Sequence, residues 1–210
     1  YNDSCNAGAQ KAVSDFGIEL KSLEGTSAQE WEANLLSACE GGYDLVIGSS
    51  SNMADYIAKH APDYPKIKFA IIDTKVDLPN VESISFAQNQ GSFLAGAAAA
   101  MFTQKTEIKG VNPEHIIGWV GGMDIPVLHD FYVGYEQGAK YIDPDISILQ
   151  SFAGSWSDPL KGKELTLAQY EQGADIVMNV ASGTGTGVLE AAKEAGEYAI
   201  GVDLNQDADQ

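Results

Sequence analysis

The chain has 210 residues, of which 44% are hydrophobic and 20% are charged, a composition typical of a folded globular protein. Its 30 acidic and 12 basic residues give a formal net charge of −18, which repels phosphate backbones and anionic membrane surfaces. Nucleic-acid polymers are therefore not expected as partners, while neutral or cationic small ligands remain open. Acidity that serves only solubility is the alternative interpretation of the charge.

Strand-like and helix-like segments alternate along the first half of the chain. The predicted strands are 17–23, 43–49, 66–73 and 80–86, and the predicted helices are 27–42, 52–62 and 88–104. The last of these helices contains the longest apolar run, Phe93–Phe102, which is half the length of about 20 residues that spans a bilayer. We therefore expect this run to be a buried helix.

After a polar, unpatterned link at 105–114, the same alternation begins again. The predicted strands are now 115–122, 145–153, 174–181 and 198–203, and the predicted helices are 126–142, 160–173 and 188–196. Such alternation is typical of α/β proteins with mostly parallel sheets covered by helices. We expect two lobes, at 1–105 and 106–210, because a single sheet of ten or more strands would be unusually wide.

In open parallel sheets, ligands bind beyond the carboxyl ends of the strands. This rule selects a set of candidate ligand loops, at residues 2–6, 49–51, 73–77, 121–124, 155–158, 182–187 and 203–206.

The loop at 182–187 is a glycine turn, Ser-Gly-Thr-Gly-Thr-Gly, between a predicted strand and a predicted helix. It lacks the lysine of a phosphate-binding P-loop, and its glycine spacing differs from the dinucleotide fingerprint. Two interpretations remain. The turn presents backbone N–H groups to an oxygen-bearing ligand, or it uses glycine only for a tight connection.

Asp73 and Asp203 each end a predicted strand. A carboxylate in this position can accept hydrogen bonds from two vicinal hydroxyls, which suits a sugar, although a helix cap or a salt bridge is the alternative. Trp156 lies in a predicted loop at the same rim, where its ring can stack on a planar ligand.

Catalytic and metal-binding patterns are missing from the sequence. The three histidines are scattered, no nucleophile elbow is present, and no cofactor or metal is expected. A carboxylate pair could hydrolyse a glycosidic bond, but nothing in the sequence specifies this chemistry, so an enzyme is not expected. Cys5 and Cys39 are either buried free thiols or a disulfide between neighbouring helices.

Several motifs together resemble one family over nearly the whole chain. They are YNDSCNAGA at 1–9, GYDLVIGSS at 42–50, KFAIID at 68–73, QGSFLAGAAAAMFT at 90–103, IGWVGGMDIPV at 117–127, GSWSDP at 154–159 and YAIGVDLNQ at 198–206. They are similar to the basic membrane protein family, the substrate-binding lipoproteins of ABC importers that include purine nucleoside receptors of PnrA type. GGMDIP and AIGVD are the most specific of the shared motifs.

This resemblance implies a type I periplasmic-binding fold, in which two hinged parallel-sheet lobes close on a nucleoside. Members of the family have a strand before the ND turn and a return to the first lobe after GVD, and both are expected outside this chain. The resemblance also implies ABC permease subunits as partners, an extracytoplasmic location and a lipid anchor outside this chain as the only membrane attachment.

The resemblance assigns ligand contacts in each lobe. In the first lobe, Asn2 and Asp3 match the ND turn and Asp73 is expected near the base. In the second lobe, Trp156 replaces the usual Phe that stacks on the base. Gly183 and Asp203 belong to the same implied set.

Gly183 matches the second glycine of the AGGTG motif, and Asp203 is expected to hold the ribose hydroxyls. The chain departs from the family pattern at Ser182, which replaces a glycine, and at VLHDF, where His129 and Asp130 stand in place of a basic residue. The expected function is binding of a nucleoside, with a purine preferred. A receptor for a sugar or another small ligand, and an enzyme acting on nucleosides, are the alternatives.

Overall fold

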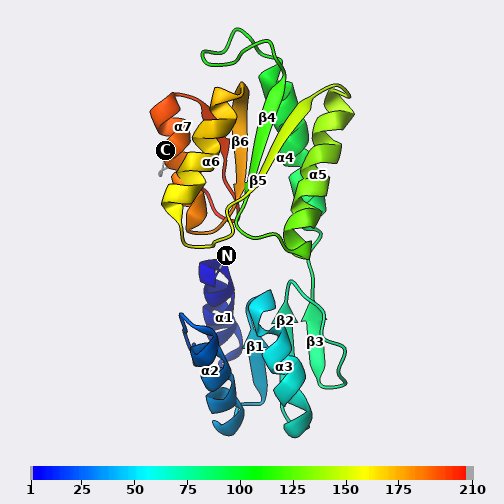
Figure 1. The fold of residues 1–210 in the computed structure, drawn as a ribbon. Coiled ribbons are helices and arrows are strands. Elements are labelled where there is room, and N and C mark those ends of the chain that lie inside the picture. The colour runs from blue at the N-terminus through cyan, green and yellow to red at the C-terminus, as the bar shows by residue number, and fades with distance from the viewer. Residues whose placement is uncertain (1, 207–210) are drawn as a thin grey trace. The chain divides into compact units, whose positions relative to one another are not determined.

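The computed structural model describes residues 2–206, which form two compact units divided along the chain between Phe86 and Ala87 (Figure 1). Both units combine parallel strands with helices, as the sequence predicts. Within residues 2–206, no helix combines the length and apolar character needed to cross a membrane.

The first unit contains a parallel sheet in the order β1-β2-β3. Its elements are α1 (Asn2–Phe16), α2 (Ala28–Glu40), β1 (Leu45–Gly48), the 3₁₀ turns Ser51–Met53 and Ala61–Asp63, α3 (Ala54–His60), β2 (Lys68–Ile72) and β3 (Val81–Ile84). Its apolar core joins α2 and α3 to the sheet through Leu35, Ile57, Phe69 and Ile71.

One expectation for this unit differs from the structure. Residues 17–23 are predicted as a strand but form none, because they pair with no strand among the described residues, and Ile18 remains exposed. Of the two alternatives for the cysteines, the disulfide is not formed, and the thiol of Cys39 on α2 is buried in the apolar core.

The second unit contains a parallel sheet in the order β5-β4-β6-β7. Its elements are α4 (Gln88–Thr103), β4 (Ile116–Gly121), α5 (Pro126–Ile142), β5 (Ser147–Phe152), α6 (Pro159–Glu171), β6 (Ala174–Val180), α7 (Thr184–Ala195) and β7 (Tyr198–Ile200). Figure 1 shows α4 and α5 on one face of this sheet and α6 and α7 on the other.

Local signals in the sequence set the ends of several helices. At the start of α2, the Ser27 side chain accepts from the Glu30 N–H, and the Glu30 carboxylate accepts from the Thr26 N–H at 2.6 Å. This reciprocal pairing satisfies donors that the helix leaves free. Helix α7 ends before Gly196, whose φ of 73° is the left-handed conformation that glycine adopts without strain.

Helix α4, which lies within the lobe expected at 1–105, packs against α5 of the second unit. The reason is a glycine contact between α4 and α5. A Cβ on Gly96 would lie 2.0 Å from the Tyr135 carbonyl oxygen, and one on Gly138 would lie 1.9 Å from that of Phe93. The backbones of the two helices therefore touch.

This contact predicts opposite effects for two alanine substitutions in the same helix. Gly96→Ala should lower the free energy of unfolding by about 1–3 kcal/mol, because the added methyl group meets the α5 backbone. Gly91→Ala, where nothing lies within 4 Å of the added Cβ, should instead stabilise the protein by up to about 1 kcal/mol through helix propensity.

Chemical denaturation followed by circular dichroism measures both changes. Equal effects of the Gly96 and Gly91 substitutions would contradict the backbone contact.

Candidate functional site

In the second unit, all four strands run in the same direction, so the loops that follow them meet at one edge of the sheet. We call this set of loops the carboxyl edge of the second unit, and it consists of residues 122–125, 153–158, 181–183 and 201–206. Three of the sequence-predicted site residues, Trp156, Gly183 and Asp203, lie on it.

Buried Thr184 connects two of these loops. Its hydroxyl donates to the Ser155 carbonyl at 2.9 Å and accepts from the Asp158 N–H at 2.9 Å. Its own N–H donates to the Trp156 carbonyl at 3.1 Å. These three bonds fix the loop that carries Trp156 against the start of α7.

Trp156 lies in a loop, as predicted, but its ring is partly buried and packs against the apolar core of the unit. The ring also covers the backbone of Gly122, where an added Cβ would lie 2.4 Å from the ring carbon Cε3. Gly122 therefore lets the indole lie directly on the main chain. Trp156→Ala is therefore expected to lower the stability of the protein as well as its affinity for a ligand, whereas the loss of a fully exposed ring would lower only the affinity.

The glycine turn is shorter than the sequence suggested, because α7 already begins at Thr184. The N–H groups of Thr184, Gly185 and Thr186 are occupied by the carbonyls of residues 181, 182 and 183. They are not presented to a ligand, which corrects one of the two interpretations of the turn. Exposed Gly183 remains at the surface of the carboxyl edge.

The other two glycines of the turn serve packing. A Cβ on Gly187 would lie 1.8 Å from the Pro159 carbonyl oxygen, so this glycine allows α6 and α7 to touch. A Cβ on Gly185 would lie 2.2 Å from Oδ1 of Asn179 on β6. The tight-connection interpretation therefore holds for Gly185 and Gly187.

Three non-glycine residues adopt positive φ angles just after strands. They are Asp73 with φ 62° after β2, Ser182 with φ 51° after β6 and Asp203 with φ 64° after β7. Such conformations cost free energy and are concentrated at functional sites. The angle at Ser182 also explains why glycine suits this position.

His115 is the fourth residue of this kind among those described, but it precedes β4 at the opposite edge. Its Nδ1 lies 2.8 Å from Oδ2 of Asp143, and this hydrogen bond lowers the pKa of the Asp143 carboxyl. The pair ties the start of β4 to the end of α5 and has a structural role.

The remaining predicted site residues belong to the first unit. Asn2 and Asp3 are exposed in the first turn of α1, where the sequence suggested a loop. An acid in this position interacts favourably with the positive end of the helix dipole. Asp73 follows β2 directly, as predicted, and its N–H donates to the Ile84 carbonyl at 2.9 Å.

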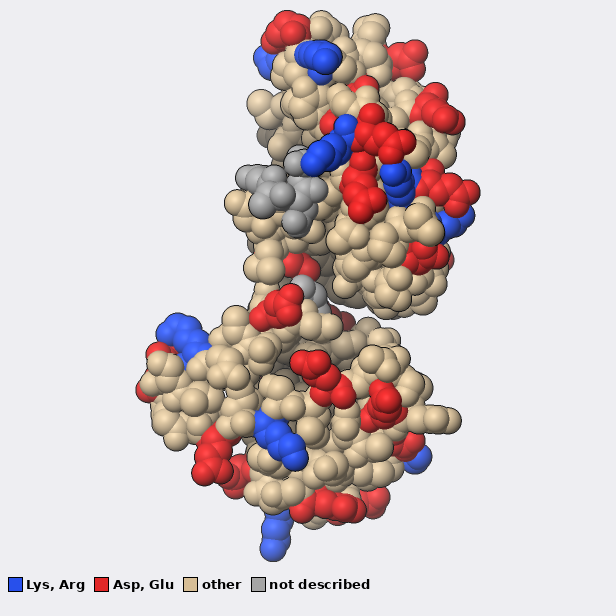
Figure 2. Space-filling view, turned by 90° about the vertical axis from the view of Figure 1, so that its left-hand side faces the viewer, with Lys and Arg blue, Asp and Glu red and all other residues tan. Residues whose placement is uncertain are grey.

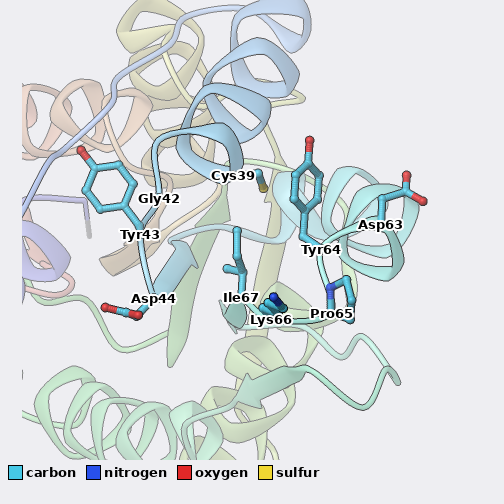
Figure 3. A pocket seen from close by; sticks show the side chains of 9 residues that line it. All are labelled: Cys39, Gly42, Tyr43, Asp44, Asp63, Tyr64, Pro65, Lys66 and Ile67. Atoms are coloured by element: carbon cyan, nitrogen blue, oxygen red, sulfur yellow. The ribbon is translucent and has the colours of Figure 1, made fainter.

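A cavity of about 450 Å³ lies elsewhere in the first unit (Figure 3). Asp44 and Ile67 line it and directly precede β1 and β2, so it is at the amino ends of these strands. In Figure 3, the carboxylates of Asp44 and Asp63 point away from Cys39 and Ile67. Because its two acids are turned away, this cavity is a poor candidate for a specific ligand site.

Two acids of the second unit lie at the amino ends of its strands. Asp175 is fully buried and accepts from the Thr103 hydroxyl and from the backbone N–H of Asn112. Burial, and secondarily the charge of Asp175, raises the pKa of Glu197. Perturbed acids can mark active sites, but Asp175 holds the loop at Asn112 against the sheet, and both acids lie far along the strands from the carboxyl edge.

Sequence reasoning missed two residues that shape the carboxyl edge. Gly122 was noted only as part of a motif. The structure shows that a glycine is required there, because the Trp156 ring lies directly over its backbone. Thr184 was counted as a turn residue. A hydroxyl at the first position of the helix, between two glycines, was the one signal that could have identified it.

Comparison with known sequences agrees with this architecture. A family model described as "ABC transporter substrate-binding protein PnrA-like" matches residues 1–210. The ABC transporter nucleoside-binding protein BmpA of Lactococcus lactis subsp. cremoris MG1363 is 36% identical, over 97% of this chain and 60% of its own length. The CD4+ T-cell-stimulating antigen of Listeria monocytogenes EGD-e is 31% identical, over 98% and 59%. The chain thus spans about 60% of the length of these curated relatives.

Solved structures give the same fold. An ABC transporter solute-binding protein from Aeropyrum pernix K1 matches with a TM-score of 0.83 and 29% identity, over 96% of this chain and 57% of that one. A transcriptional activator of the comK gene from Bacillus halodurans matches with a TM-score of 0.80 and 22% identity, over 99% and 69%, which shows the fold alone. The α/β fold with parallel sheets is that of periplasmic solute-binding proteins. The chain belongs to the PnrA-like family of ABC transporter substrate-binding proteins.

Proposed function

We propose that this chain binds a nucleoside, with a purine base preferred, as the substrate-binding component of an ABC importer. The observation that carries the proposal is the carboxyl edge of the second unit, which combines an aromatic ring, Trp156, with a strained and exposed acid, Asp203. Family membership and the nucleoside-binding description of the Lactococcus relative support it.

Each part of a nucleoside has a counterpart in this proposal. The indole of Trp156 stacks on the base, Asp203 accepts from the two ribose hydroxyls, and exposed Gly183 allows the ligand to approach the backbone. The loop that carries Trp156 is anchored by Thr184, so the ring is held in place before the ligand arrives. Such preorganisation reduces the entropy lost on binding.

The first unit contributes further proposed contacts, Asn2, Asp3 and Asp73, which rest on the resemblance and on the strain at Asp73. As a member of an importer system, the protein would deliver its ligand to ABC permease subunits outside the cytoplasm. A lipid anchor outside this chain would hold it at the membrane.

A free phosphate group is disfavoured on the same edge. The three N–H groups at the start of α7 are already bonded to carbonyls, so the usual anion site at a helix N-terminus is occupied. Acidic side chains also predominate on the surface in Figure 2, in keeping with the net charge of −18. Both features favour a nucleoside over a nucleotide.

The first test compares ligands that share a base and a sugar. Inosine and guanosine should raise the melting temperature of the protein, whereas their 5′-monophosphates at the same concentration should raise it much less. Galactose, ribose and free hypoxanthine serve as controls in the same thermal-shift assay. Stabilisation by a sugar and not by nucleosides would replace the proposal with a sugar receptor.

The second test concerns the Trp156 ring. Trp156→Leu keeps an apolar side chain against Gly122 but removes the aromatic face, so nucleoside binding should weaken by about 1–3 kcal/mol. Trp156→Phe retains a ring and should bind within about threefold of the wild type, less than the 1.4 kcal/mol that corresponds to a factor of ten. Isothermal titration calorimetry separates binding from stability, and equal affinities of the Leu and Phe variants would show that the ring does not stack.

The third test concerns Asp203. Asp203→Asn preserves the side-chain size and tolerates the positive φ, but it removes the charge that strengthens bonds from the ribose hydroxyls. Affinity for inosine should fall by about 1.5–3 kcal/mol, with a much smaller loss for 2′,3′-dideoxyinosine.

Asp145→Asn is the matched control for Asp203→Asn, because Asp145 is exposed and precedes β5 at the opposite edge of the same sheet. It should leave both affinities unchanged. If Asp203→Asn lost the same affinity for inosine and for dideoxyinosine, Asp203 would not bind the ribose hydroxyls.

A further inference from the structure

Asn179 is a polar side chain in a strand whose residues are all buried. It lies on β6, one position before the end of the strand, and none of its surface is exposed. Strand β6 lies between β4 and β7 in the sheet. A buried amide in such a place needs hydrogen-bond partners for both of its polar atoms.

Only one of these atoms has such a partner within the described part of the chain. Nδ2 of Asn179 donates to the carbonyl of Ile200, the last residue of β7, at 3.2 Å. Oδ1 has no hydrogen-bond partner, and it lies so close to Gly185 in the first turn of α7 that a Cβ there would be 2.2 Å away. The amide is therefore wedged between the end of β7 and the start of α7.

These two neighbours lead directly into two loops of the carboxyl edge. The chain leaves β7 after Ile200 and reaches Asp203 three residues later. The turn with Ser182 and Gly183 immediately precedes α7. One side chain thus contacts the end of β7 and the start of α7, which we call the supports of the two loops. An aliphatic residue of similar shape would fill the space but would not form the bond to Ile200.

We propose that Asn179 is a positioning residue, which sets the spacing between the turn at 181–183 and the loop that carries Asp203. The proposal rests on the proposed nucleoside function where it concerns the ligand. Asn179 itself touches no ligand. It acts through the carbonyl of Ile200 and the backbone of Gly185, and so controls how well Asp203 meets the ribose hydroxyls.

The experiment uses Asn179→Leu, with Asn179→Ala as a second variant should the larger side chain prevent folding. Val177→Ala is the matched control, because Val177 lies on the same strand two positions earlier, is fully buried and packs with Val120 and Val188. Side chains two positions apart on a strand share a face. The control loses core packing against the same strand and helix, but it leaves the bond to the Ile200 carbonyl and the contact with Gly185 in place.

The first measurement needs no ligand. Amide hydrogen exchange is followed by NMR at Thr184, Gly185 and Thr186 in the start of α7, and at Val202 and Leu204 after β7, all of which are hydrogen-bonded. Substitution of Asn179 should speed exchange in both groups by about tenfold or more, beyond the change in Val177→Ala. Faster exchange in one group alone, or no excess over the control, would overturn the proposal.

The second measurement is the affinity for inosine and for 2′,3′-dideoxyinosine. Asn179→Leu should weaken inosine binding by about tenfold while dideoxyinosine changes by less than about twofold. Val177→Ala should leave the ratio of the two affinities unchanged. Faster exchange in both loops with an unchanged ratio would overturn the positioning role. A wild-type protein that binds no nucleoside, with the exchange result as expected, would refute the proposed function and leave the coupling of the loops supported.

Discussion

The hydroxyl of Thr184 is the contact on which the carboxyl edge of the second unit depends. It bridges a carbonyl and an N–H of the loop after β5, from a buried position at the start of α7. Removing it would leave two backbone groups without their hydrogen-bond partner, and buried polar groups without a partner lower the stability of a protein. The place of the Trp156 loop against the start of α7 follows from this junction, while Gly187 allows α6 and α7 to touch.

Close backbone contact is the second constraint on this fold. Gly122 lies under an indole ring, Gly187 lies against the α6 backbone, and Gly96 lies against the α5 backbone. In each case a methyl group would overlap atoms that cannot move independently. At these positions glycine allows close packing and is not needed for its conformational freedom. The glycines of the turn at 182–187 therefore do not indicate a phosphate site.

The alternation of strands and helices was predictable, because runs such as 174–181 are buried on both faces and leave a continuous apolar signal. The acids after β2 and β7 were predictable as well, since parallel strands expose their carboxyl ends at one edge. The segment at 17–23 has the alternation of a strand but pairs with no strand among residues 2–206. The place of α4 depends on Gly138 of α5, which contacts Phe93 from 45 residues further along the chain, and no local pattern reports such a contact.

The turn at 182–187 also has contacts that its sequence alone does not reveal. Its sequence cannot tell whether N–H groups face a ligand or close on neighbouring carbonyls, because that depends on where α7 begins. The strain at Ser182 and Asp203 is likewise a property of the folded backbone. The strand-end rule selected loops that lie together at the carboxyl edge, and the geometry decided which of their atoms are available.

A crystal structure of the protein grown with inosine would show the proposed contacts themselves. We expect the base against the Trp156 ring, and both ribose hydroxyls within hydrogen-bonding distance of the Asp203 carboxylate. We also expect the N–H groups of Thr184, Gly185 and Thr186 to keep their bonds to the protein backbone. Inosine bound away from Trp156 and Asp203, in the cavity beside Cys39 for example, would contradict the proposal.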